Sequence, residues 1–346
     1  MHWLAVLLGF LPALQQAADS ALLSPPNGVS PAVSAQPAQP FDQWLHDLVD
    51  EARTRGFSDE LINETLVGLE PLPRVLERDR SQAELTPGFT YYLSRHVTKS
   101  LVRRGRDVSK EHLPTLRRIE NDYDVQRRFV VAIWGMETRY GRITGRTPVF
   151  QALATLAWEP RRAAYFRGEL FDALSMVARG HIEPALMTGS WAGAMGQAQF
   201  MPSNYLKYAV DFDRDGRTDI WTNTGDALAS IANYLKGFGW KNSETWGREV
   251  KASPAVRRAI AAGIPKRSEG CYAIRNMTER RPLDTWREFG VVRTDGGPLP
   301  RADLSAALVD VGDRAFLVYP NYDAILGYNC AHYYALTVAL LADQLR

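Results

Sequence analysis

The 346-residue chain contains little cysteine and almost no excess of charge. Its 41 basic and 39 acidic residues leave a formal net charge of +2. Such a weak overall field gives no reason to expect a nucleic acid or an anionic membrane surface as a partner. The six histidines form no His-Glu-x-x-His pair and no Gly-x-x-x-x-Gly-Lys loop is present. Zinc catalysis and nucleotide chemistry therefore find no support in the sequence.

A long apolar run is also absent from the N-terminus. A membrane-spanning helix needs about 20 apolar residues, whereas this run reaches only about 13 before Gln15. Residues 1–18 have the shape of a signal peptide, although the usual Lys or Arg is missing. No cysteine follows the run, which excludes a lipid anchor at the cleavage point. We expect export to the periplasm in soluble form, with no transmembrane anchor and no lipoprotein cysteine.

The two cysteines are Cys271 and Cys330. In an exported protein they could pair, because the compartment is oxidising. A disulfide that closes their loop of about 60 residues would stabilise the fold by about 4 kcal/mol in the chain-entropy model. Two separate buried thiols are the alternative, and the sequence leaves this choice open.

The pattern of apolar residues predicts a mainly α fold (α+β) over residues 41–346. Residues 19–40 are rich in Pro, Ser and Ala and indicate a linker. Thr147 and Pro148 suggest a cap and first-turn proline for a helix that continues to Leu156. Short runs between residues 246 and 328, such as 315–319, suggest a few small strands. One further helix is predicted to begin at residue 41. The others are predicted at residues 59–69, 90–104, 110–123, 127–140, 161–179, 226–238 and 331–346.

Glu137 is the first candidate for catalysis. Counting back in helical steps meets Trp134, Ile133 and Phe129, so the carboxylate shares a stripe with large apolar side chains. Burial there would raise its pKa, and so would the negative end of the helix dipole if Gly141 stops the helix. The residue would then donate a proton near neutral pH. The alternative is a carboxylate at a helix edge that points to water or pairs with a neighbouring arginine.

A glycine-rich stretch at residues 187–200 interrupts the helical pattern and predicts a loop. It places Ser190, Gln197 and Gln199 among glycines and large apolar side chains. Glycines let the backbone approach a ligand closely, and neutral polar groups suit hydroxyl and amide partners. A purely structural turn is the alternative.

An acidic segment matches the first half of a calcium loop. Asp211, Asp213 and Asp215 occupy positions one, three and five, and Arg217 would supply a backbone carbonyl at position seven. Position twelve is Thr222 instead of glutamate, so Asp226 would have to close the site. We expect a structural Ca2+ here and no cofactor for catalysis. An acidic turn without metal is the alternative.

Several ordered motifs together resemble the membrane-bound lytic murein transglycosylase B family, and the similarity spans roughly residues 41–346. The motifs are residues 133–141 (Ile-Trp-Gly-Met-Glu-Thr-Arg-Tyr-Gly), residues 193–203 (Gly-Ala-Met-Gly-Gln-Ala-Gln-Phe-Met-Pro-Ser), the acidic loop 211–221, residues 231–235 (Ile-Ala-Asn-Tyr-Leu) and the pair Tyr328 and Asn329.

The resemblance implies a lysozyme-like catalytic core at about residues 125–240 together with the C-terminal helix 331–346. Extra helices would precede it, and a small β-containing portion would cover about residues 246–325. The family cleaves the β-1,4 bond between N-acetylmuramic acid and N-acetylglucosamine of peptidoglycan glycan strands. It forms a 1,6-anhydromuramic end in place of adding water.

The resemblance also assigns roles to individual positions. Glu137 falls on the family's catalytic acid/base. The family's calcium ligands fall on Asp211, Asp213, Asp215, Arg217 and Asp226. The spacing before Asp226 can be one residue longer than usual. Cys330 lies directly after Asn329, where many relatives carry another residue. The implied saccharide-binding residues are Ser190, Gln199, Tyr234, Tyr328, Asn329 and, with Tyr91 as the adjacent alternative, Tyr92.

This mechanism would explain a lone glutamate. Most glycosidases need two carboxylates. Here the N-acetyl group of the sugar would stabilise C1, and its own C6 hydroxyl would be the nucleophile, so Glu137 would act first as acid and then as base. The alternatives are a hydrolytic muramidase on the same core and a catalytically silent peptidoglycan-binding scaffold.

Overall fold

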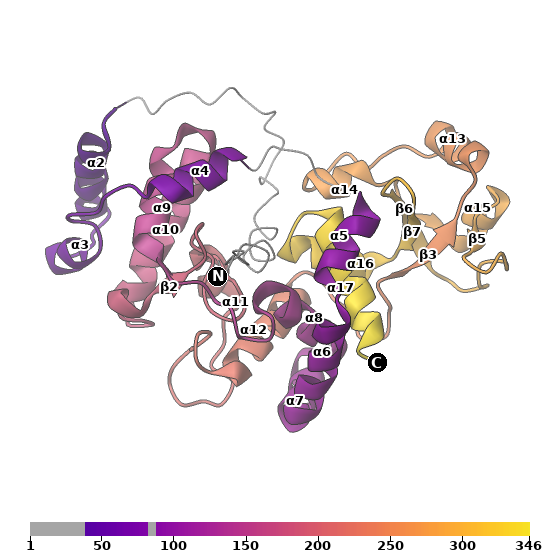
Figure 1. Ribbon diagram of the computed structural model, residues 1–346, viewed down its shortest axis with the longest axis horizontal. Coiled ribbons are helices and arrows are strands. Elements are labelled where there is room, and N and C mark those ends of the chain that lie inside the picture. The colour runs from indigo at the N-terminus through magenta and orange to yellow at the C-terminus, as the bar shows by residue number, and fades with distance from the viewer. Residues whose placement is uncertain (1–38, 82–87) are drawn as a thin grey trace, which may run out of the picture.

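The computed structural model describes residues 39–81 and 88–346. Helices dominate it, and one small sheet lies at one end (Figure 1). The expected signal peptide at residues 1–18 and all but the last two residues of the expected linker at residues 19–40 lie outside the described residues. The mainly helical fold class predicted from the sequence is confirmed.

No single helix within the described ranges is long and apolar enough to cross a membrane. One pair, α16 (Pro320–Tyr328) and α17 (His332–Gln344), meets that test only when its two members are taken together, and the two are bent by 115°.

The N-terminal helices pack against a second helical layer. Helices α2 (Phe41–Thr54), α3 (Asp59–Thr65) and α4 (Pro73–Ser81) contact α9 (Val149–Trp158) and α10 (Ala163–Ala178) (Figure 1). Two buried carboxylates join these layers. Arg161 donates to Asp79 at 3.0 Å, and Arg80 donates to Glu159 at 2.9 Å. Pairing in this way compensates the cost of burying each carboxylate.

Helix α8 (Arg127–Thr138) lies at the centre of the molecule and carries Glu137. It packs against α6 (Lys99–Glu111), α7 (Leu113–Tyr123), α12 (Thr224–Gly237) and α17. Every residue from 129 to 138 is buried. Such a helix is apolar on all sides because neighbours surround it, so Glu137 is carried by the core itself.

The remaining elements connect these layers. Strands β1 and β2 form a two-stranded pair, in which Thr147 lies opposite Gly189 and Pro148 opposite Thr188. The bounds are α5 (Phe89–His96), β1 (Thr147–Pro148), η1 (Pro160–Arg162), η2 (Pro184–Leu186), β2 (Thr188–Gly189) and α11 (Pro202–Tyr208).

The larger sheet has five antiparallel strands in the order β4-β6-β7-β3-β5. Its side chains alternate between two cores. In β7, Phe316 and Val318 join the main core, whereas Leu317 packs in a smaller core with Trp286 under the other face. The bounds are β3 (Gly247–Lys251), α13 (Pro254–Gly263), α14 (Tyr272–Asn276), β4 (Arg281–Pro282), α15 (Leu283–Glu288), β5 (Val292–Arg293), β6 (Ser305–Asp310) and β7 (Ala315–Val318).

Two helix predictions are wrong, the first for a local reason and the second because of pairing with a distant segment. The helix expected at residues 90–104 is two helices, because Thr98 caps the second one: its Oγ1 accepts the Leu101 N–H at 3.2 Å. Thr147 and Pro148 do not open a helix. They form strand β1, and α9 begins at Val149.

Other differences concern ends and short elements. The helix expected at residues 161–179 is α10, which ends at Ala178, two residues before Gly180 at φ +71°. The C-terminal helix is α17. The expected strands are present between residues 247 and 318. Helical periodicity did not predict the short helices α4, α11, α13, α14, α15 and α16.

Candidate active site

The carboxyl group of Glu137 is buried, with 2% of the residue exposed. It lies in the last turn of α8, next to the final residue Thr138. Trp134, Ile133 and Phe129 are buried on the same helix, as predicted. The alternative of a carboxylate that points to water does not hold for this residue.

Glu137 Oε1 accepts a hydrogen bond of 2.5 Å from the Tyr334 hydroxyl, and Oε2 is buried without a hydrogen-bond partner. Burial raises the pKa of Glu137 from 4.5 to about 8, and the Tyr334 hydrogen bond lowers it by a smaller amount. No carboxylate in the described part of the chain contributes to this shift. The acid is therefore protonated near neutral pH and has one close polar partner.

Helix α8 ends at Thr138, two residues earlier than expected. Gly141 was predicted to stop the helix, but Arg139, Tyr140 and Gly141 all have positive φ, at 50°, 63° and 77°. The Arg139 N–H bonds the Gly135 carbonyl as a left-handed cap. This early stop leaves Glu137 at the helix end, where the dipole disfavours the carboxylate form.

The glycine-rich loop folds around Ser190. Its Oγ accepts the N–H groups of Ala194 at 3.0 Å and Ala192 at 3.3 Å. The Ser190 N–H bonds the Ala194 carbonyl at 2.8 Å, which closes a tight turn. The hydroxyl hydrogen of Ser190 remains available to donate to another group. Ser190 thus has a structural role in the turn, and this role does not conflict with a contact to sugar.

Two glutamines fix the loop to helix α8 and to the segment that follows it. Gln197 Oε1 accepts from Trp134 Nε1 at 3.0 Å, and its carbonyl accepts from Thr138 Oγ1 at 3.0 Å. Gln199 has a left-handed backbone, with φ 50°, and donates to the carbonyls of Gly196 at 2.9 Å and Thr144 at 3.1 Å. The loop and the end of α8 therefore form one connected unit.

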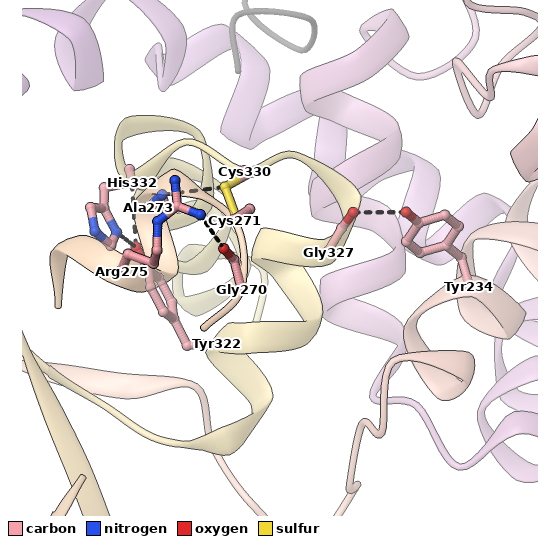
Figure 2. The surroundings of a disulfide bond; sticks show 9 residues. All are labelled: Tyr234, Gly270, Cys271, Ala273, Arg275, Tyr322, Gly327, Cys330 and His332. Carbon is pink, nitrogen blue, oxygen red and sulfur yellow. Dashed lines mark hydrogen bonds between the residues drawn. A yellow bond between two sulfur atoms is a disulfide. The ribbon is translucent and has the colours of Figure 1, made fainter. Parts of the chain in front are cut away.

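A cluster of aromatic rings lies beside the acid. Tyr234 and Tyr328 have ring centroids 4.8 Å apart, and Phe200 lies 5.5 and 5.9 Å from them. The Tyr328 hydroxyl donates to the Ala198 carbonyl at 2.5 Å, and the Tyr234 hydroxyl to the Gly327 carbonyl at 2.7 Å (Figure 2). Tyr328 thus joins this cluster to the glycine-rich loop, and Gln197 joins that loop to the end of α8 beside Glu137.

Asn329 and Tyr92 complete the predicted set. Asn329 is buried directly after helix α16. Tyr92 is half-buried and stacks on His96 with centroids 4.0 Å apart, and its ring lies 5.6 Å from that of Tyr333, the residue before Tyr334. The adjacent Tyr91 is 57% exposed. The structure thus brings Tyr92, and not Tyr91, toward the neighbourhood of Glu137.

Sequence reasoning missed Tyr334. A signal existed, because a tyrosine in a buried, otherwise apolar helix must find a hydrogen-bond partner for its hydroxyl. The partner, however, is 197 residues away along the chain. Nothing local in the sequence connects the two residues.

The acidic loop gathers three carboxylates. One oxygen each from Asp211, Asp213 and Asp226 lies within 4.8 Å of the others. The Asp215 carboxylate is not part of this group, and it accepts the Arg217 N–H at 2.8 Å. Thr222, at position twelve, donates its hydroxyl to Asp219.

The two cysteines form a disulfide between Cys271 and Cys330, with Cα atoms 6.3 Å apart. Of the two alternatives that the sequence left open, the structure shows the disulfide and not two separate thiols. The bond joins the start of α14 to the turn after Asn329 (Figure 2).

Comparison with known proteins gives consistent matches. The family model "Transglycosylase SLT domain" matches residues 40–343. Membrane-bound lytic murein transglycosylase B of Escherichia coli is 33% identical over 311 residues, which cover 86% of this chain and 80% of that protein.

Solved structures agree. SltB3 from Pseudomonas aeruginosa, solved with NAG-anhNAM-pentapeptide and with NAG-NAM-pentapeptide, is 39% identical with a TM-score of 0.79, over 89% of this chain and 80% of that one. Slt35 of E. coli, solved with calcium, is 30% identical with a TM-score of 0.71, over 87% and 92%. Sequence and structure thus agree over nearly the whole described chain, which belongs to the transglycosylase SLT family of lytic murein transglycosylases.

Proposed function

We propose that Glu137 alone supplies acid and base catalysis in cleaving the β-1,4 bond between N-acetylmuramic acid and N-acetylglucosamine of peptidoglycan. The protonated carboxyl group gives its proton to the glycosidic oxygen as the bond to C1 breaks. The N-acetyl group of the sugar stabilises C1. The carboxylate then takes the proton of the C6 hydroxyl while the C6 oxygen bonds C1, which forms the 1,6-anhydro end and returns Glu137 to its protonated state.

The observation that carries this proposal is the environment of Glu137. A carboxyl group with a pKa of about 8 holds a proton at neutral pH. The Tyr334 hydroxyl can stabilise the carboxylate form once that proton has left.

The surroundings supply saccharide binding and exclude water. We propose that Tyr234, Tyr328, Asn329 and Tyr92 form one wall of the saccharide site, and that Ser190 and Gln199 contact sugar polar groups. Aromatic faces cover the apolar faces of sugars and keep water from C1. The complexes of SltB3 with muropeptides support glycan strands as the substrate.

The carboxyl of Glu137 is tested by one substitution and one matched control. Glu137→Gln keeps the shape of the side chain and removes the transferable proton, and we expect activity on purified sacculi to fall by at least about 1,000-fold. Glu169→Gln alters another buried acid, whose oxygens bind Ser203 at the start of α11, and should keep most activity. Full activity of Glu137→Gln would overturn the assignment.

We also propose that the acidic loop binds a structural Ca2+. The convergence of the Asp211, Asp213 and Asp226 oxygens suits a hard cation that prefers oxygen ligands. The Arg217 carbonyl, and Asp215 after a change of its side-chain rotamer, would complete the ligand set. The calcium complex of Slt35 supports this proposal. Periplasmic location is a further proposal, supported by the murein substrate of the family and tested by cell fractionation.

A further inference from the structure

We propose that the Cys271–Cys330 disulfide positions the part of the saccharide wall formed by Tyr328 and Asn329, and that its reduction weakens glycan binding. This inference rests on the proposed function of the Glu137 site. It adds a redox-dependent positioning element to that site.

Cys330 lies in a sharp turn. Helices α16 and α17 are bent by 115° across residues 329–331. Tyr328 is the last residue of α16, Asn329 follows, and α17 carries Tyr334, the hydrogen-bond partner of Glu137. A shift of this turn therefore moves the saccharide wall first.

The other end of the disulfide is held by polar contacts to α16 and to Cys330. Cys271 precedes helix α14, and the Ala273 N–H donates to Cys330 Sγ at 3.3 Å (Figure 2). The segment before α14 is fixed to α16 by Arg267, which donates to Asp323 at 2.7 Å. The disulfide thus ties the turn to a held segment.

Non-covalent contacts hold both sides of the turn. On one side, Tyr234 bonds the Gly327 carbonyl at 2.7 Å, and Tyr328 bonds the Ala198 carbonyl at 2.5 Å. On the other side, the Tyr322 hydroxyl lies 3.0 Å from His332 Nδ1 (Figure 2). These contacts remain after reduction, so we expect the fold to persist and the wall, no longer tied through Cys330, to shift by less than about 1 Å.

A dithiol can reach the disulfide. Both cysteines are half-buried, and the neighbouring Tyr272 is 60% exposed. One thiolate of the dithiol attacks a disulfide sulfur and forms a mixed disulfide, and its second thiol releases it. The dithiol becomes a disulfide, while two electrons and two protons pass to Cys271 and Cys330 as two thiols.

The test measures steady-state kinetics on soluble glycan strands before and after reduction with dithiothreitol, with thiols counted by alkylation and mass spectrometry. We expect KM to rise about ten-fold, because misplacement of binding groups by less than 1 Å has effects of this order. The turnover number should change by less than about two-fold, and the pH profile should keep its position. Re-oxidation should restore KM. An unchanged KM in fully reduced protein would overturn the inference, and so would a lower turnover number at constant KM.

Two variants complete the design. Cys271→Ser/Cys330→Ser should show the raised KM and no response to dithiothreitol, and if it does not fold, the reduced wild type carries the test. Arg275→Ala is the matched control, because it removes the hydrogen bond to the Gly270 carbonyl beside the disulfide and should leave KM unchanged. Inactive oxidised protein would contradict the proposed function, whereas active protein indifferent to reduction would contradict only this inference.

Discussion

The Tyr334 hydroxyl donates a hydrogen bond of 2.5 Å to Glu137 Oε1, and it joins the C-terminal helix to the carboxyl group that we propose as the catalytic acid. Burial favours the protonated acid, and this bond favours the carboxylate. The two effects oppose each other and leave a group that can lose and regain one proton near neutral pH. A residue that must act as both acid and base needs such a balance.

Tyr334→Phe removes only this hydrogen bond. Since the bond lowers the pKa of Glu137, its loss raises that pKa further, and the pH profile of activity should shift to higher pH. A hydrogen bond to a charged group contributes about 1.5–3 kcal/mol, so we expect activity to fall roughly ten-fold or more. Tyr205→Phe is the control, because it loses a buried bond to the Thr218 carbonyl. An unmoved pH profile in Tyr334→Phe would argue against the balance described above.

The pH dependence of stability reports on Glu137 directly. Its pKa is about 8 in the folded protein and 4.5 as the reference value, so the folded state holds the extra proton between these values. The contribution of Glu137 to stability is therefore fully present below about pH 4.5 and decreases as the pH rises to about 8, by up to about 4 kcal/mol. Glu137→Gln lacks this loss. Thermal unfolding from pH 5 to 8 should show the stability of Glu137→Gln rising relative to that of the wild type. A difference in stability that stays constant over this range would contradict the burial of an ionisable acid.

Gly135 lets Tyr140 pack under helix α8. A Cβ at this position would lie 2.6 Å from the Tyr140 ring, whose hydroxyl bonds the Leu101 carbonyl at 3.0 Å. We expect Gly135→Ala to destabilise the protein by about 1–3 kcal/mol through overpacking, despite its better helix propensity. Gly168→Ala in α10 meets nothing within 4 Å and should be stabilising by up to about 1 kcal/mol. Denaturant unfolding of both variants measures their free energies of unfolding. Equal changes in the two variants would refute the expected contrast.

Removal of calcium tests the acidic loop. A bound ion at 100 times its Kd stabilises by about 2.7 kcal/mol, so a chelator should lower the melting temperature by several degrees. Asp213→Asn should abolish this response, because it removes one of the three converging carboxylates. Asp219→Asn is the control, since its carboxylate binds the Trp221 and Thr222 N–H groups. A wild type that is indifferent to chelator and calcium would refute a structural ion.

The sequence predicted what depends on local order. Glu137, its apolar stripe and the acidic loop follow from spacing within one segment, and the main helices follow from periodicity. The break at Thr98 also had a local signal, because threonine is a common N-cap residue. The helical periodicity that continues on both sides of Thr98 concealed this signal.

What could not be predicted depends on contacts between distant segments. Thr147 and Pro148 form a strand only because Thr188 and Gly189 lie beside them. The Tyr334 bond to Glu137 and the pairing of Cys271 with Cys330 likewise require the folded chain. Short helices such as α16 have too few residues for periodicity to identify them.

The central claim is that one buried carboxyl group, that of Glu137, cleaves the glycosidic bond without a second carboxylate and without water. The most direct measurement digests purified sacculi in isotopically labelled water and weighs the muropeptides by mass spectrometry. We predict 1,6-anhydro ends that are lighter by one water than the hydrolytic products and carry no heavy oxygen. Reducing ends that contain the heavy oxygen would contradict the account.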